Sequence, residues 1–78
     1  MNKTQKKKLE RIASVLEDLM SDLYAISDEE REKYDNSPGN LQDSERVQRY
    51  QEIADTLDSI GLDIDCAVHE LRVEVIDY

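Results

Sequence analysis

Apolar residues recur every three or four positions through the N-terminal part of the chain. The residues of this first stripe are Leu9, Ile12, Leu16, Leu19, Leu23 and Ile26. Alternating steps of three and four are typical of the a and d positions of helix-packing heptads. The pattern predicts one helix over about residues 5–35. A break at Ser27, where a capping box could start a new helix, is the main alternative.

The C-terminal half repeats the same rhythm. Its stripe consists of Tyr50, Ile53, Leu57, Ile60, Ile64, Ala67 and Leu71. This spacing predicts a second helix over about 44–77, and the turn residues around Pro38 and Gly39 predict a loop over about 36–43. Two long helices joined by a short loop lie antiparallel, so we expect a single all-α helical hairpin domain over residues 1–78. A helix pair leaves half of each stripe exposed, which favours assembly into a four-helix bundle or a larger helical oligomer.

A further apolar stripe lies on the opposite side of the second predicted helix. Its members, again three or four residues apart, are Leu62, Cys66, His69, Val73 and Ile76. Because a short hairpin cannot bury two sides of one helix, we interpret this outer stripe as an interface with a partner or another copy. The alternative is a rotated helix, in which Val73 and Ile76 enter the core and Leu62 alone stays exposed. Gly61 predicts a bend or a close approach of the two helices.

Composition agrees with long aliphatic helices. The chain has 78 residues, no Trp or Phe, two Gly and one Pro, and 37% of its residues are charged. Residues 1–11 carry five basic side chains against Glu10 alone, whereas residues 12–78 carry five basic and eighteen acidic ones. An acidic body repels phosphate backbones, which disfavours direct binding to nucleic acid. Its acidity suits docking to a basic partner, mimicry of DNA, or simple solubility.

The chain offers few residues for chemistry. Cys66 and His69 are one helical turn apart, but no third orienting group accompanies them, so we expect no catalytic residue. One Cys and one His are too few for a metal site and no phosphate-binding loop is present, so we expect neither metal nor cofactor. The single cysteine, and the lack of an apolar run of about 18 residues, predict a soluble cytoplasmic protein without a membrane contact.

Polar and basic side chains gather around the predicted loop. The candidates for binding an anionic or nucleotide ligand there are Tyr34, Asn36, Asn40, Gln42, Ser44, Arg46 and Arg49. The cations would attract the charge of such a ligand, and Tyr34 would stack on a base. The alternative is structural. Amides and hydroxyls would cap backbone groups, with Asp43 or Ser44 starting the second helix, and the cations would pair with neighbouring glutamates.

The loop and its flanks also show a family resemblance. The segment consists of Asn36-Ser37-Pro38-Gly39-Asn40-Leu41-Gln42-Asp43-Ser44-Glu45-Arg46, preceded by Asp28-Glu29-Glu30 and Tyr34. It resembles a segment of small acidic helical proteins encoded by bacteriophages and prophages, most specifically in the pattern N-x-P-x-N-L-Q-x-S-E-R. The similarity covers roughly residues 12–60, and the outer stripe is a departure from that group. The resemblance implies a small non-enzymatic protein that binds and disables a host protein, and it assigns no catalytic residue.

Pattern and resemblance together predict a non-enzymatic phage-type accessory protein. It would bind and inhibit a host protein, for example a component of a bacterial anti-phage defence, as a homo-oligomer in the cytoplasm of that host. One alternative is an oligomeric sponge that sequesters a small nucleotide immune signal at the hairpin tip. Another is an acidic protein that mimics DNA.

Overall fold

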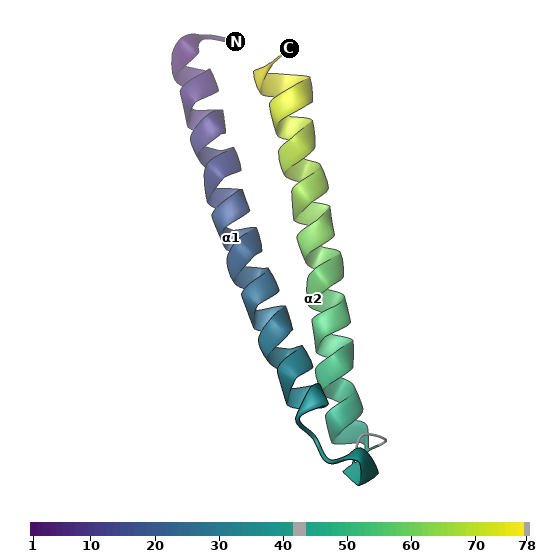
Figure 1. The fold of residues 1–78 in the computed structure, drawn as a ribbon. Coiled ribbons are helices and arrows are strands. Elements are labelled where there is room, and N and C mark those ends of the chain that lie inside the picture. The colour runs from purple at the N-terminus through teal and green to yellow at the C-terminus, as the bar shows by residue number, and fades with distance from the viewer. Residues whose placement is uncertain (42–43, 78) are drawn as a thin grey trace.

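Two long helices lie side by side and antiparallel in the computed structural model (Figure 1). Helix α1 spans Lys3–Asp35, a 3₁₀ turn η1 spans Gly39–Leu41, and α2 spans Glu45–Glu70 and continues into the π-helical η2, Leu71–Ile76. The structure describes residues 1–41 and 44–77. The hairpin measures 60 × 16 × 12 Å, with both chain ends at one end and the loop at the other. The prediction of an all-α helical hairpin is confirmed.

A capping box fixes the start of α1. The Asn2 side chain accepts a hydrogen bond from the Gln5 backbone N–H at 2.8 Å, and the Asn2 N–H donates to Gln5 Oε1 at 3.1 Å. The helix then runs without interruption past Ser27 to Asp35, so the alternative of a break at Ser27 is wrong. Ser27 does not start a new helix because its hydroxyl bonds across to α2 instead.

Ser44 starts α2. Its Oγ accepts a hydrogen bond from the Val47 backbone N–H at 3.3 Å, and Glu45 places a carboxylate near the positive end of the helix dipole. At its other end the helix widens into η2, where the Asp77 N–H donates to the Arg72 carbonyl at 2.8 Å. A π turn holds an extra residue, and it therefore shifts every side chain that follows it to a different side of the helix.

Small residues form the line of contact between the helices, which we call the seam. Its buried positions are spaced seven or fourteen residues apart, and they are Ala13 and Ser27 on α1 and Val47, Ala54, Gly61 and Val68 on α2. Small side chains let two helix backbones approach closely. A Cβ added at Gly61 would lie 2.6 Å from the Tyr24 ring, so the close approach predicted at Gly61 is confirmed.

The π turn brings Ile76 into the end of the seam. A step of seven from Val68 would place Val75 there, but η2 adds one residue, and Ile76 is only 6% exposed while Val75 is exposed. The prediction that Ile76 faces away from α1 as part of the outer stripe is therefore wrong. Val73 stays exposed, so the rotation considered as the alternative occurs for Ile76 alone.

The two long stripes expected to form the interhelical core lie beside the seam instead. Ile12, Leu19 and Ile26 are 48%, 53% and 50% exposed, and Ile60 is 42% exposed. The reason is steric, since two closely approaching helices leave room for Ala, Ser and Gly at the seam and displace larger side chains to its edge. Each helix is therefore turned from the expected register by part of the roughly 100° between neighbouring residues, so that Leu16, Leu23 and Leu57 stay half-buried.

Candidate interaction surfaces

One long side of the hairpin is apolar along both helices. We call it the apolar face, and it comprises Ile12, Leu16, Leu19, Leu23 and Ile26 of α1 and Ile53, Leu57, Ile60, Ile64, Ala67, Leu71 and Val75 of α2 and η2. Residues three and four positions apart share one side of a helix. Leu16 lines a common groove with Ala67 and Leu71, which places the two stripes on the same side of the hairpin. These side chains are half-buried beside the seam and exposed farther from it.

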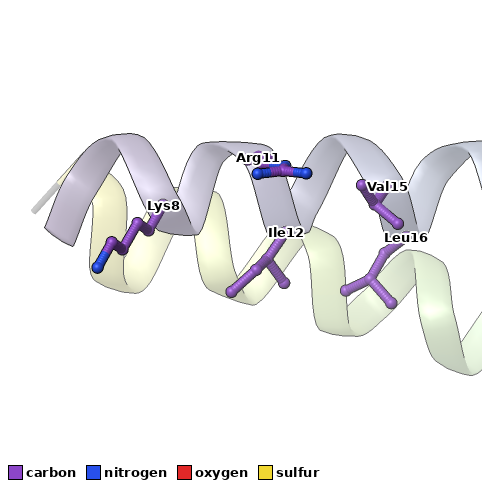
Figure 2. A pocket seen from close by; sticks show the side chains of 5 residues that line it. All are labelled: Lys8, Arg11, Ile12, Val15 and Leu16. Carbon is purple, nitrogen blue, oxygen red and sulfur yellow. The ribbon is translucent and has the colours of Figure 1, made fainter. Parts of the chain in front are cut away.

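Shallow grooves mark the apolar face near the chain ends. The residues that line the first groove, all from α1 and shown in Figure 2, are Lys8, Arg11, Ile12, Val15 and Leu16. The neighbouring groove between the helices includes Glu70 and Glu74 in its lining. At this end of the hairpin the apolar face therefore has a basic rim on α1, Lys8 and Arg11, and an acidic rim on the other helix, Glu70 and Glu74.

The opposite long side, which we call the polar face, is held by contacts that cross the seam. Ser27 is fully buried; its hydroxyl donates to Asp58 Oδ1 at 2.6 Å and lies 3.1 Å from the Ala54 carbonyl oxygen. Arg31 donates to Asp58 Oδ2 at 2.5 Å and to Asp55 Oδ1 at 3.2 Å. The Arg31 guanidinium also donates to the Ser27 hydroxyl at 3.2 Å. A buried hydroxyl with these partners fixes the axial register of α1 against α2.

The same cluster shifts the pKa values of two of its members. The hydrogen bond from Arg31, with a second one from Ser27, holds the pKa of the Asp58 carboxyl below its ordinary value. The hydrogen bond to Asp58 in turn raises the pKa of the Arg31 guanidinium. Both shifts favour the charged form of each side chain, so the ion pair is stabilised from both partners.

The predicted outer stripe lies on the polar side of α2. Leu62 is 59% exposed, and Cys66, His69 and Val73 are exposed as well. His69 and Val73 line a groove with Glu17 of α1, which pairs with Arg72. The structure thus brings four of the five predicted interface residues to one side of α2 and separates Ile76 from them.

The candidate ligand residues at the hairpin tip do not converge on one cavity. Asn36 lines one groove, which it shares with two glutamates. Arg46 and Arg49 line another groove, again with two glutamates, and Arg49 pairs with Glu52 at 3.2 Å. Carboxylates in both grooves repel an anion, so neither groove concentrates positive charge for a nucleotide.

The remaining candidate ligand residues that the structure describes at the hairpin tip lie outside these two grooves. Ser44 caps α2, as the structural alternative predicts. Tyr34 is half-buried in the last turn of α1, and Asn40 is exposed in η1. Gln42 and Asp43 lie outside the described residues. The tip therefore shows capping and ion pairing, while a ligand site there stays a prediction.

Acidic, His and Cys side chains are dispersed along the hairpin. Across residues 1–41 and 44–77, no three of them come close enough together to hold a metal ion. Cys66 and His69 are both exposed on α2. As far as the helices are described, neither has an apolar stretch that could span a membrane.

Sequence reasoning missed the cluster of Ser27, Arg31 and Asp58. It considered Ser27 only as a possible capping residue and assigned Asp58 no role in the contact between the helices. A signal was present in the spacing, because Asp58 and Asp65 are seven residues apart beside the seam positions Ala54 and Gly61. Polar residues that keep the heptad spacing next to a buried column indicate a polar flank, which a search for large apolar residues overlooks.

Comparison with known protein families, with curated proteins and with solved structures finds no match to this chain. The contrast between the apolar face and the polar face is therefore the basis for assigning a function.

Proposed function

We propose that this protein is a non-enzymatic binding protein whose apolar face is covered by other helices in the assembled state. The observation behind the proposal is the uncovered row of Leu19, Ile26 and Ile60, which continues along both helices. Keeping apolar surface in water costs about 25 cal/mol per Å². Contiguous exposed apolar surface of this kind marks an interaction site. Two hairpins packed through this face would form a four-helix bundle.

The proposed target of the assembled protein is a host protein, which it inhibits by occupying part of that protein's surface. The likeness of the loop segment to phage and prophage proteins supports this setting, the cytoplasm of a bacterial host. When the apolar face is covered, the outer stripe of Leu62, Cys66, His69 and Val73 stays accessible on the polar side of α2. The host contact is assigned to that stripe, with the surrounding carboxylates attracting a basic partner.

Phage plating on bacteria that carry a defence system tests the inhibitory role. Expression of the wild-type protein should raise the plating efficiency of a phage that the defence restricts. Leu62→Asp combined with Val73→Asp should lose this effect but keep its helical content and its assembly. Leu19→Asp combined with Ile60→Asp should lose both assembly and inhibition. A wild-type protein that assembles but changes plating in no defence system of a broad panel would refute the inhibitory role.

The nucleotide-sponge alternative has less support, because glutamates line both grooves at the hairpin tip. Calorimetric titration with cyclic nucleotides and ADP-ribose derivatives is its direct test, and binding that Arg46→Ala abolishes would revive it. The DNA-mimic alternative depends on acidity alone and stays a prediction.

A further inference from the structure

We infer that the apolar face is occupied by a second copy of this chain that lies in the same direction. In this pair α1 of each copy packs against α2 of the other, and both loops lie at one end of the bundle. The two-fold axis then runs along the length of the hairpins. The inference rests on the proposed function, since it names the partner of the apolar face and the orientation of the pair.

Contacts within the hairpin determine which residues of the two helices lie level. Tyr24 lies against Gly61, and Leu16 shares a groove with Leu71. In an antiparallel pair, each step toward the C-terminal end of one helix corresponds to a step toward the N-terminal end of the other. The level of every other residue along the hairpin follows from these two contacts.

The exposed apolar residues of the two helices match level for level. The approximate pairs are Ile12 with Val75, Leu19 with Ala67, and Ile26 with Ile60. A two-fold axis along the hairpin leaves the position of each residue along the length of the bundle unchanged. Every exposed apolar residue of α1 therefore meets an apolar residue on the α2 side of the other copy. An opposed pair would stack α1 on α1 and α2 on α2, and with the two α1 helices centred on each other Ile12 would meet Ile26. Apolar matching therefore allows both orientations, and the charged rims decide between them.

The size of the face also fits a second copy. The two helices lie side by side, so the broad side of the hairpin measures 60 by 16 Å. A second copy presents a side of the same dimensions, so it can cover the face over its whole length and width. The α1 stripe ends at Ile26 and the α2 stripe begins at Ile53, so a second copy of the same length leaves neither stripe uncovered.

The charges at the two rims of the apolar face are complementary when the two copies lie in the same direction. By the same levels Arg11 lies opposite Glu74, whereas Lys8 lies nearer the chain ends and Glu70 lies level with Leu16. None of these four side chains forms an ion pair with another described residue of its own chain. In the same-direction pair the basic rim of α1 faces the acidic rim of the other copy, and this happens twice because the pair is symmetric.

Charge-swap variants test the orientation. The basic-rim variant carries Lys8→Glu and Arg11→Glu, and the acidic-rim variant carries Glu70→Lys and Glu74→Lys. Each variant alone places like charges at both rim contacts, and we expect its self-association to weaken by roughly tenfold or more. Mixing the two variants restores opposite charges at both contacts. The mixture should therefore form a heterodimer about as tightly as the wild type forms its homodimer, and less so at high salt.

Native mass spectrometry of the mixed variants measures the outcome, with circular dichroism of each variant alone as the control for folding. A predominant heterodimer supports the inference. If the acidic-rim variant self-associates like the wild type and mixing rescues nothing, the same-direction pair is wrong while assembly through the apolar face still stands. If wild type and both variants are all helical monomers, the assembly in the proposed function fails as well.

Discussion

The two long faces of the hairpin consist of residues that alternate within the same heptads, yet they differ in how far their side chains find partners within the chain. On the polar face, Ser27, Arg31 and Asp58 find hydrogen bonds and opposite charges within the chain. On the apolar face, Leu19 and Ile60 have no comparable cover, because the helices are joined along a narrow seam of small residues. The polar cluster finds its partners within a single chain, whereas the apolar face would be covered only in the proposed assembly.

This difference assigns separate roles to the two faces. Hydrogen bonds and ion pairs depend on geometry, so the polar cluster specifies how α1 and α2 align. Apolar burial is less directional and roughly proportional to area, so in the proposed assembly the apolar face would supply the association free energy. Substitutions on the polar face should therefore change the stability of the hairpin, whereas substitutions at the outer edge of the apolar face should change assembly.

The largest expected effect comes from placing charge on the apolar face. Leu19→Asp combined with Ile60→Asp should raise the dissociation constant for assembly by about 100-fold or more, because each change removes an apolar contact and opposes burial with a charge. Leu62→Asp combined with Val73→Asp is the matched control on the polar face and should assemble normally. Sedimentation velocity at micromolar concentration compares the two. Equal dissociation of both double variants would contradict the distinction between the faces.

A smaller effect is expected at the seam, where Gly61 meets Tyr24. Gly61→Ala should destabilise the wild type by about 1–2 kcal/mol because the added methyl displaces the Tyr24 ring. In a Tyr24→Ala background the same change should instead stabilise the protein by up to about 1 kcal/mol, since Ala favours the helix over Gly. Thermal melts at one fixed protein concentration give this double-mutant cycle. The same sign in both backgrounds would mean that the Tyr24 ring does not oppose a methyl group at Gly61.

Removing the Ser27 hydroxyl tests the polar cluster. Ser27→Ala should lower the free energy of unfolding by about 0.5–1.5 kcal/mol, because Asp58 and Arg31 each lose one hydrogen bond. Ser21→Ala is the matched control, since Ser21 is exposed on the same helix. Its substitution should leave the unfolding free energy unchanged or slightly raised. Urea unfolding of both variants measures the difference, and equal values would remove the cluster from the account of hairpin stability.

The smallest expected effect is on the stability of the hairpin at acidic pH. Because the folded state holds the Asp58 pKa below its ordinary value, the carboxylate contributes stability that is fully present above the unfolded-state pKa of about 3.9. That contribution is lost as the pH falls below about 4 through the lower pKa of the folded state. Asp58→Asn should therefore show a weaker loss of melting temperature below pH 4 than the wild type. The exposed Asp63→Asn serves as control, and identical pH profiles for wild type and Asp58→Asn would contradict the shift.

Much of the hairpin could be predicted from periodicity and turn chemistry. Long runs with steps of three and four are strong helix signals, and Pro38 and Gly39 form the main turn signal of the chain. Gly61 also indicated a close approach of the helices. The side of each helix that forms the seam could not be predicted in the same way, because the heptad pattern assigns the largest apolar residues to the contact between the helices. Ala13, Ser27 and Ala54 are weak sequence signals of a helix contact because they are small, although they are the most completely buried residues.

Two further features depend on tertiary contacts that local sequence patterns indicate weakly or not at all. The π turn η2 moves Ile76 from the outer stripe into the seam, and a single extra residue in a helix has no reliable sequence marker. Ser27 has the side chain of a good cap, yet its hydroxyl binds Asp58, 31 residues away along the chain. The outer stripe was predicted as a group, and four of its residues are exposed together, but their contact with a host protein remains a proposal.

The mass of the wild-type protein in solution, followed over a wide concentration range, tests the central claim most directly. The chain has a mass of 9.1 kDa. Sedimentation equilibrium from nanomolar to high micromolar concentration should show the mass rise from that of one chain to that of two, with the apolar faces buried against each other. A fully helical protein that keeps the mass of a single chain at every concentration would contradict the claim that the apolar face is an assembly surface.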